Sequence, residues 1–303
     1  MSSTPRAVAA VVALAALAVA ACGGGTSAAQ PTPNPNVIPT VKAIASLHAM
    51  LPASNKSSGV LIFDTVPNPP WAIVGADGNV DTGVDIDLGT SLTQVLGLKL
   101  QTVLVGDAST LLAGISAGRY DTFLGPLGIT AARKATLFEL IWVHNTFYFE
   151  VAKSSTFQTV GDLCGKNVAV LTGTIGQTTI VPGASKTDCV ANNKPAINLV
   201  SFATDPEAQL AVKAGRADAY ALSDASCVYS TRQPGASDLR CLVPAAGDNI
   251  AVNQAAMAVS NQNQALVNAL QAALMELYKQ GIYQKIMAKW GITSDGVTEF
   301  VLG

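Results

Sequence analysis

The apolar residues of this chain follow two spacings, one typical of strands and one typical of helices. Short runs rich in β-branched or aromatic residues predict strands at 60–63, 98–105, 122–124, 168–171 and 219–222. Apolar positions three and four residues apart predict helices at 85–96, 111–117 and 208–214, and a helix pair within 262–290 that is broken near Gly281. Because strands and helices alternate, we expect an α/β fold with largely parallel sheets.

One short unit occurs twice, almost one hundred residues apart. Ala117-Gly118-Arg119-Tyr120-Asp121 and Ala214-Gly215-Arg216-Ala217-Asp218 each follow a predicted amphipathic helix and precede a short apolar strand. Similar units in each half predict two lobes that are built alike. The alternative is that the match has no special meaning, because glycine supplies the left-handed conformation that commonly ends a helix.

The first residues have the pattern of an export signal. A single charge at Arg6 is followed by an uncharged run of small and apolar residues from Ala7 to Ala21, which predicts a signal peptide over 1–21. This run is shorter than the roughly 20 residues that a membrane-spanning helix needs, and no later stretch is long and apolar enough to span a bilayer. We therefore expect the mature chain to be anchored at most.

The signal ends in Val19-Ala20-Ala21-Cys22, which resembles a bacterial lipobox. In that interpretation Cys22 is lipidated and becomes the first residue of a protein held on the extracytoplasmic face of the cell membrane. The alternative is ordinary signal cleavage beside an incidental cysteine. The residues that follow are mainly Gly, Ser, Thr, Pro and Asn, so we expect a flexible tether over 22–45.

Composition and cysteine content narrow the remaining possibilities. A formal net charge of −2 argues against a nucleic-acid partner. Four cysteines follow Cys22, and in an exported chain an even number predicts two disulfides. Three pairings are possible; we favour Cys164–Cys189 and Cys227–Cys241, because both close short segments of one lobe. A metal site is not expected, since the chain has no C-x-x-C spacing and its histidines lie far from these cysteines.

Candidate binding residues follow the predicted strands, because ligands of open α/β sheets bind beyond the carboxyl ends of the strands. Arg133 follows a glycine-rich turn, and its planar guanidinium would suit a carboxylate. Asp224 follows the strand in the second half, so the two would form a clamp for a zwitterion. The segment Thr172-Gly173-Thr174-Ile175-Gly176 is a second candidate anion site, through its exposed N–H groups and hydroxyls. Each candidate has a simpler interpretation. Arg133 would lie on a solvated helix face, Asp224 would be an N-cap, and the segment 172–176 would be a tight turn.

A series of short motifs resembles the family 3 extracellular solute-binding proteins of ABC importers, which serve polar amino acids. The similarity runs from about Ser46 to Trp290. The matching segments, in order, are Asn68-Pro69-Pro70-Trp71, Asp77-Gly78, Gly83-Val84-Asp85-Ile86-Asp87-Leu88, Gly118-Arg119-Tyr120-Asp121, Thr130-Ala131-Ala132-Arg133, 162–168, 215–219 and Lys289-Trp290-Gly291.

The resemblance implies a periplasmic-binding-protein-like (type II) fold with two hinge crossovers. Lobe 1 would comprise 46–149 and 250–303, and lobe 2 would comprise 150–249, with the chain crossing near Glu150 and Asn249. Arg133 would bind the carboxylate of the ligand with backbone help from Thr130 and the Thr174 turn, and Asp224 would bind its ammonium. The other expected ligand-binding residues are Gly128, Thr172, Asn68 and Trp71.

The chain departs from the family pattern at the walls of this site. The family usually has aromatic residues near Asn68 and Ala108, and a hydroxyl residue where Gly128 lies. The positions here are small or polar, which leaves the side-chain specificity open. Trp71 would supply one wall or lie in the core.

The function implied is capture of a small amino-acid-like solute by lobe closure, followed by delivery to ABC permease subunits. The protein would act as a monomer without a cofactor or a catalytic group. Two alternatives remain open: a sensor or scaffold lipoprotein with the same fold, and an enzyme similar to cyclohexadienyl dehydratase. For the enzyme, Glu150 and Asp64 are the acid–base candidates.

Overall fold

The computed structural model describes residues 37–245, 247–248, 250 and 253–303. The expected signal peptide, Cys22 and most of the expected tether lie outside the described residues. None of the helices in the described ranges is long and apolar enough to cross a membrane.

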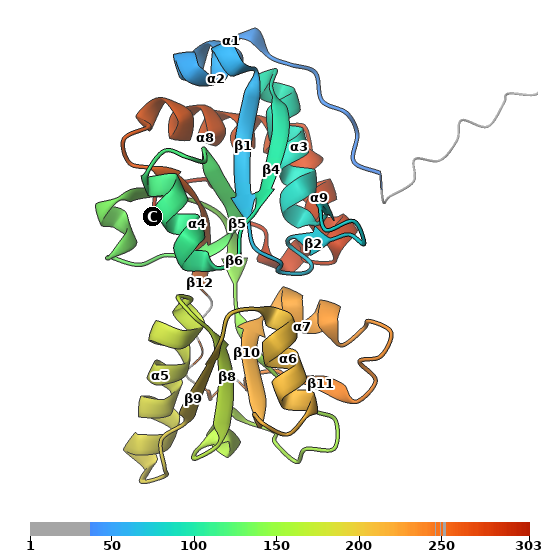
Figure 1. Ribbon diagram of the computed structural model, residues 1–303, viewed down its shortest axis with the longest axis vertical. Helices are drawn as coiled ribbons and strands as arrows, with labels where there is room; N and C mark the ends of the chain where they lie inside the picture. The colour runs from blue at the N-terminus through green and yellow to red at the C-terminus, as the bar shows by residue number, and fades with distance from the viewer. Residues whose placement is uncertain (1–36, 246, 249, 251–252) are drawn as a thin grey trace, which may run out of the picture. The chain divides into compact units, whose positions relative to one another are not determined.

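The first lobe is built on a five-stranded mixed sheet (Figure 1). Its order is β4 (Lys99–Leu104), β1 (Val60–Thr65), β5 (Thr122–Gly128), β12 (Asn253–Ser260) and β6 (Leu137–Asn145). Strand β1 runs parallel to β4 and β5, whereas β12 runs antiparallel to β5 and β6. The long helices of this lobe are α3 (Val84–Leu96), α4 (Ala108–Ser116), α8 (Gln264–Lys279) and α9 (Ile282–Trp290). Helices α3, α8 and α9 pack on one another, and their apolar stripes join the sheet in one continuous core.

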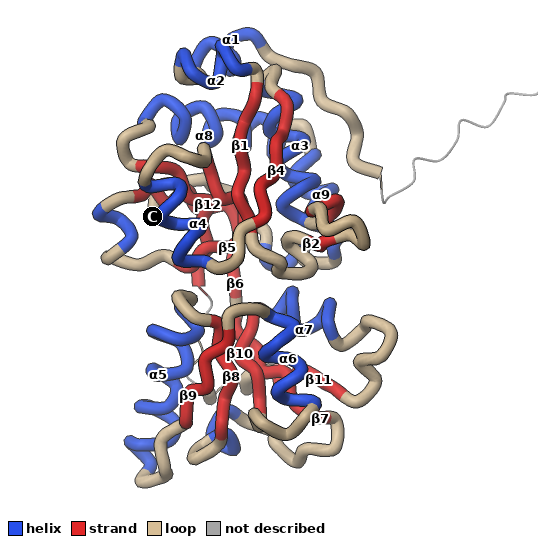
Figure 2. The backbone as a smooth tube through the Cα atoms, in the orientation of Figure 1, coloured by secondary structure: helices blue, strands red, loops and turns tan. Residues whose placement is uncertain are grey.

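The second lobe is a smaller five-stranded sheet (Figure 2). Its order is β11 (Leu239–Leu242), β7 (Phe147–Ala152), β10 (Ala219–Ser223), β8 (Asn167–Leu171) and β9 (Asn198–Phe202). The central strand β10 is buried on both faces of the sheet. Its successive residues point to opposite sides, so they contact different clusters. Ala219 and Ala221 join a cluster with α5 (Val181–Ala184), whereas Tyr220 and Leu222 join a cluster with α6 (Asp205–Lys213). The second lobe therefore has two smaller clusters in place of one large core.

The remaining elements are short. They are the helices α1 (Ala45–Met50), α2 (Ala53–Ser58) and α7 (Asp224–Ser230), the strands β2 (Ile73–Val74) and β3 (Val80–Thr82), the 3₁₀ turns η1 (Arg133–Ala135), η2 (Val160–Leu163), η5 (Val190–Asn192) and η6 (Thr293–Asp295), and the π-helical turns η3 (Gly176–Ile180) and η4 (Ser185–Cys189).

The repeated sequence unit has the same structural role in both lobes. Each copy links a helix to a strand, α4 to β5 in the first lobe and α6 to β10 in the second. Its glycine has a positive φ, 71° at Gly118 and 67° at Gly215, as a helix C-terminus requires. Its aspartate accepts a hydrogen bond from the neighbouring strand, Asp121 from the Ile62 N–H at 2.7 Å and Asp218 from the Asn167 N–H at 2.9 Å. The repeat therefore fastens two adjacent strands in each lobe.

Two boundaries differ from the sequence expectations. Strand β6 ends at Asn145 and β7 begins at Phe147, so the first crossing is at Thr146, and Glu150 lies inside β7 of the second lobe. The return crossing follows β11 and precedes β12, and the expected position Asn249 lies outside the described residues. The expected tether is also too long, because the Val41 N–H donates to Gln94 Oε1 and Val41 is only 7% exposed.

Both disulfides lie in the second lobe with the pairing that we favoured. Cys164 pairs with Cys189, and Cys227 pairs with Cys241. The first bond joins the end of η2 to η4, and the second joins α7 to β11. Each bond therefore ties a peripheral helical segment of the second lobe to another part of the same lobe.

Candidate functional site

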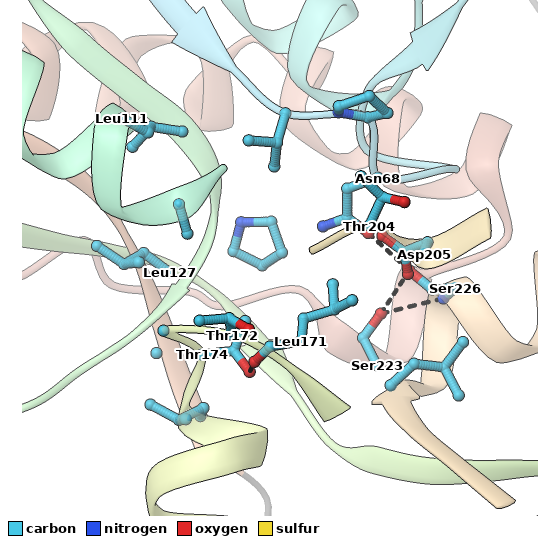
Figure 3. Close-up of a pocket in the computed structure, with 18 of the residues that line it drawn as sticks. Asn68, Leu111, Leu127, Leu171, Thr172, Thr174, Thr204, Asp205, Ser223 and Ser226 are labelled. Atoms are coloured by element: carbon cyan, nitrogen blue, oxygen red, sulfur yellow. Dashed lines mark hydrogen bonds between the residues drawn. The ribbon is translucent and has the colours of Figure 1, made fainter. Parts of the chain in front are cut away.

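A pocket lies between the lobes, at the ends of strands from both sheets (Figure 3). The first lobe contributes the loop after β1, the start of α4 and the end of β5. The second lobe contributes the turn after β8, the start of α6 and the end of β10. Of the residues expected to bind a ligand, five line this pocket: Asn68, Gly128, Arg133, Thr172 and Thr174.

Arg133 supplies the positive charge of the pocket and contacts both lobes. It is the first residue of η1, and its Nη1 donates to the carbonyl of Gly128 in its own lobe. Its Nη2 donates to the carbonyl of Gly173 in the second lobe at 2.9 Å. Burial lowers the pKa of Arg133, and the nearby Glu139 carboxylate opposes this shift. A guanidinium remains charged at any physiological pH, so the pocket has a permanent cation.

Thr130 acts on Arg133 indirectly. Its hydroxyl and its carbonyl both accept from the Arg133 N–H, at 3.3 and 3.2 Å. These bonds hold the turn that points Arg133 towards Gly128. Thr130 is not in the described pocket lining, so its expected contact with a ligand stays a prediction.

Asp205 supplies a negative charge that the sequence analysis did not select. It is the first residue of α6, and it lines the pocket with an exposure of only 5%. Its Oδ1 accepts from the hydroxyl of Tyr220, whereas its Oδ2 is buried without a hydrogen-bond partner among the described residues. Burial raises the pKa of Asp205 to about 6, and the bond from Tyr220 opposes the shift. Asp205 thus lines the pocket with one carboxyl oxygen that is bonded to Tyr220 and one that is buried without a partner among the described residues.

A local signal for Asp205 exists in the sequence. Thr204 and Glu207 form a capping box at the start of α6, with Pro206 in the first turn. This helix start follows β9 directly, so it marks the carboxyl end of a parallel strand. The sequence analysis placed the anion at Asp224, after the strand that follows the repeated unit. Asp205 instead precedes that unit in the chain.

Asp224 lies at the end of its strand as expected, but it lines a different cavity from Arg133. Ser223 is the N-cap of α7 and faces the pocket, while Asp224 is one residue further and its N–H donates to the carbonyl of Thr146. Asp224 shares the second cavity with Tyr148 and Asp295. Burial raises the pKa of Asp224 to about 6, and the Asp295 carboxylate adds to the shift. The structure therefore separates Asp224 from Arg133, and Asp205 replaces it as the anion of the pocket.

Trp71 belongs to the core of the first lobe and is not in the described pocket lining. It is 1% exposed and packs edge-on against Trp142, with ring centroids 5.9 Å apart. Its Nε1 nevertheless donates to Ser223 Oγ of the second lobe at 3.3 Å. Asn68 makes a similar contact, since its Oδ1 accepts from Ser226 Oγ at 3.2 Å. Both residues therefore connect the lobes, and only Asn68 faces the pocket.

Three of the N–H groups that we expected to be free in the turn after β8 are engaged within the protein. The N–H groups of Thr172, Gly173 and Thr174 donate to the Phe202 carbonyl, Gln177 Oε1 and the Leu171 carbonyl respectively. The turn instead supplies an acceptor, the Gly173 carbonyl, to Arg133. Arg133 is the cation among the described residues that line the pocket.

Gly128 lies where the backbone of the first lobe touches a side chain of the second. A Cβ at this position would lie 2.4–2.7 Å from three side-chain atoms of Ile175. Real Cβ atoms do not approach so closely, so any larger residue would push Ile175 away. Ile175 therefore leaves no room at position 128 for the hydroxyl residue that the family usually has.

We expect Gly128→Ala to hold the lobes further apart. Small-angle X-ray scattering should show a larger radius of gyration, and the double variant Gly128→Ala/Ile175→Ala should restore the wild-type value. Gly106→Ala is the matched control, because Gly106 also lines the pocket but a Cβ there meets nothing within 4 Å. An unchanged radius for Gly128→Ala would contradict the close contact.

Asp205 should lower the stability of the fold at neutral pH. Because its pKa is raised from 3.8 to about 6, the folded state holds this proton more tightly than the unfolded state does. The stabilisation is complete below about pH 4 and is lost as the pH rises through 6. Asp205→Asn should therefore raise the free energy of unfolding at pH 7, measured by urea denaturation, by on the order of 3 kcal/mol. The gain should be much smaller at pH 4.5, and an equal gain at both pH values would reject burial of the charge as its cause.

Comparison with known proteins identifies the chain's relatives. Residues 61–293 match the family model for bacterial extracellular solute-binding proteins, family 3. The arginine-binding protein ArgT of Corynebacterium glutamicum is 30% identical, over 95% of this chain and 92% of the relative. The ABC transporter arginine-binding protein 1 of Escherichia coli is 26% identical, over 73% of this chain and 86% of the relative.

A solved structure has the same fold. A variant of the arginine-binding protein of T. maritima superposes with a TM-score of 0.65 at 29% identity, covering 78% of this chain and 97% of that one. The two-lobe architecture, the pocket between the lobes and the extent of the family match agree with one another. The chain belongs to family 3 of the bacterial extracellular solute-binding proteins.

Proposed function

We propose that this solute-binding protein captures an α-amino acid between its lobes. Arg133 binds the carboxylate of the ligand, and Asp205 binds its ammonium. The observation that carries the proposal is that two opposite charges, one from each lobe, line a single pocket, and that Asp205 Oδ2 has no partner among the described residues. Charge-assisted hydrogen bonds are strong in such a partly buried site, because little water competes for them.

Binding would favour closure because the two charges belong to different lobes. A ligand that touches both lobes is held more tightly when they are close, so it shifts the population towards the closed form. The polar contacts between the described parts of the lobes include Arg133 to Gly173, Trp71 to Ser223 and Ser226 to Asn68. Such contacts are readily exchanged with water, which suits reversible closure.

The relatives support the amino-acid class and the role in transport. Their names state arginine and, for a protein of Escherichia coli that is 22% identical, L-cystine as ligands, and one name states an ABC transporter. We propose that the closed protein acts as a monomer that delivers its ligand to ABC permease subunits. Membrane attachment would come from lipidation of Cys22, which the Val19–Cys22 sequence supports, and would place the protein on the extracytoplasmic face.

The acid–base residues expected for an enzyme do not lie in the described pocket. Asp64 and Glu150, the acid–base candidates, are fully buried and do not belong to the described pocket lining. Glu150 Oε2 accepts a hydrogen bond from Ser230, away from this pocket. Among the described lining residues, the acidic side chains are Asp205, which would bind the ammonium of the ligand, and the phenol of Tyr220, which donates to Asp205. No feature of the pocket favours a sensor over a transport component.

The proposed clamp can be tested by binding measurements. A calorimetric screen of the 20 standard amino acids against residues 37–303 should yield a ligand for the wild type. Arg133→Ala and Asp205→Asn should each weaken its affinity by about 100-fold, because each leaves one charged end of the ligand unpaired. Asp224→Asn is the matched control and should bind as the wild type does, since Asp224 lines the other cavity. Tight binding that survives both pocket substitutions would reject the clamp.

Lipidation can be tested separately with the full chain in a bacterial host. The wild-type protein should fractionate with membranes and should incorporate a labelled fatty acid. Cys22→Ser should remove the label and release the protein from membranes, while a Cys164→Ser/Cys189→Ser double variant should retain the label. Equal labelling of wild type and Cys22→Ser would reject the anchor.

A further inference from the structure

The pocket has only one charged group of each sign. Among the described residues that line it, the ionisable side chains are Arg133, Asp205 and Tyr220. The hydroxyl of Tyr220 donates to Asp205, and burial raises the pKa of this phenol well above 10, so Tyr220 is neutral. If Arg133 and Asp205 hold the two ends of an amino acid, as proposed above, no charged side chain of the lining remains for the rest of the ligand.

Acidic residues outside the lining are bonded to the protein, uncharged or in another cavity. Glu139 accepts from the Thr130 N–H, and Glu207 accepts from the N–H groups of Ala203 and Thr204. Asp107 precedes the lining residue Ala108, but its Oδ1 accepts from the Ser109 and Thr110 N–H groups and its Oδ2 accepts from the Thr110 hydroxyl. Asp64 is fully buried in β1, and burial raises its pKa to about 8, so it is protonated at neutral pH. Asp224 lines the second cavity. None of these carboxyls belongs to the described lining of the pocket.

The rest of the wall is mainly apolar. Its apolar members are Val66, Pro67, Ala108, Leu111, Leu112, Phe123, Pro126, Leu127, Phe147, Leu171, Ile175, Ala203, Ala221 and Leu222. Figure 3 shows Leu111 and Leu127 of the first lobe and Leu171 of the second around the same space. Apolar side chains therefore come from both lobes, as a ligand side chain enclosed by closure would require.

The neutral polar residues of the wall are largely bonded to the protein itself. Ser223 and Ser226 bond to each other, and Ser226 donates to Asn68. The hydroxyls of Thr172 and Thr174 donate to the carbonyls of Phe202 and Leu171. Thr204 caps α6. Asn145 is the exception, because it also lines the pocket and its buried Oδ1 has no partner among the described residues, so this acceptor is left to read a polar side chain.

We infer that the preferred ligand is an α-amino acid with an uncharged, apolar side chain. A lysine- or arginine-like side chain would be enclosed without a counterion, and a glutamate-like side chain would compete with the carboxylate for Arg133. Either charge would lose its hydration without compensation, which strongly disfavours binding. An aliphatic or thioether side chain instead replaces water against the leucines and Ile175.

The inference is tested by comparing ligands on one wild-type protein. Calorimetry with leucine, isoleucine, methionine and phenylalanine should find at least one that binds 10-fold or more tightly than arginine, lysine, glutamate and glutamine. A charged amino acid or glutamine that binds as tightly as the best apolar one would overturn the inference and leave the amino-acid-binding function intact. Failure of all of these amino acids would overturn the proposed function, and this inference with it.

A substitution in the pocket wall gives a second test, which does not depend on how the wild-type protein ranks the amino acids by affinity. Ala108→Asp places a carboxylate on the wall at the first turn of α4, where an acidic residue suits the helix terminus. It should raise the affinity for arginine relative to leucine by 10-fold or more. Ala113→Asp is the matched control, because Ala113 lies on the exposed side of α4 and is not in the described lining, and its ratio should equal that of the wild type. An unchanged ratio in Ala108→Asp would overturn the assignment of this wall to the ligand's side chain.

Discussion

One guanidinium joins the two halves of this protein. Arg133 belongs to the first lobe, yet it donates to carbonyls of both lobes, at Gly128 and Gly173. A buried cation must be surrounded by acceptors, because an unpaired charge away from water is very unfavourable. Backbone carbonyls satisfy it in part, and a carboxylate would satisfy it better, since both of its oxygens can accept at once. The geometry of the pocket therefore follows from how one charge is shared between two lobes.

The fold was predictable because its signals are local and repeated. The helical spacing of 85–96 and the tail from 262 to 290 correspond to α3, α8 and α9, and the repeated Gly-Arg-x-Asp unit has the same role in each lobe. Exact boundaries were less accessible. The crossing at Thr146 does have a mark in the sequence, because His144, Asn145 and Thr146 form a polar break between two mainly apolar segments, and this break lies just before the expected position Glu150.

The binding residues were harder to predict, because the direction of a side chain at the start of a helix depends on the cap. At α7 the pocket-facing residue is Ser223, and Asp224, one position later, faces the other cavity. At α6 the N-cap is Thr204, and Asp205 lines the pocket together with it. Likewise, no pattern in the sequence reveals that the N–H groups after β8 are already engaged. Tertiary hydrogen bonds decide these matters.

The two lobes are held together by different means. The first has one continuous apolar core and contains no cysteine, whereas the second divides its apolar residues between the two faces of a smaller sheet and carries both disulfides. While the cysteines are reduced, the second lobe lacks its two disulfide bonds, whereas the first lobe has all of its stabilising contacts. Passage from a reducing to an oxidising compartment would thus complete one half of the molecule and leave the other as it was.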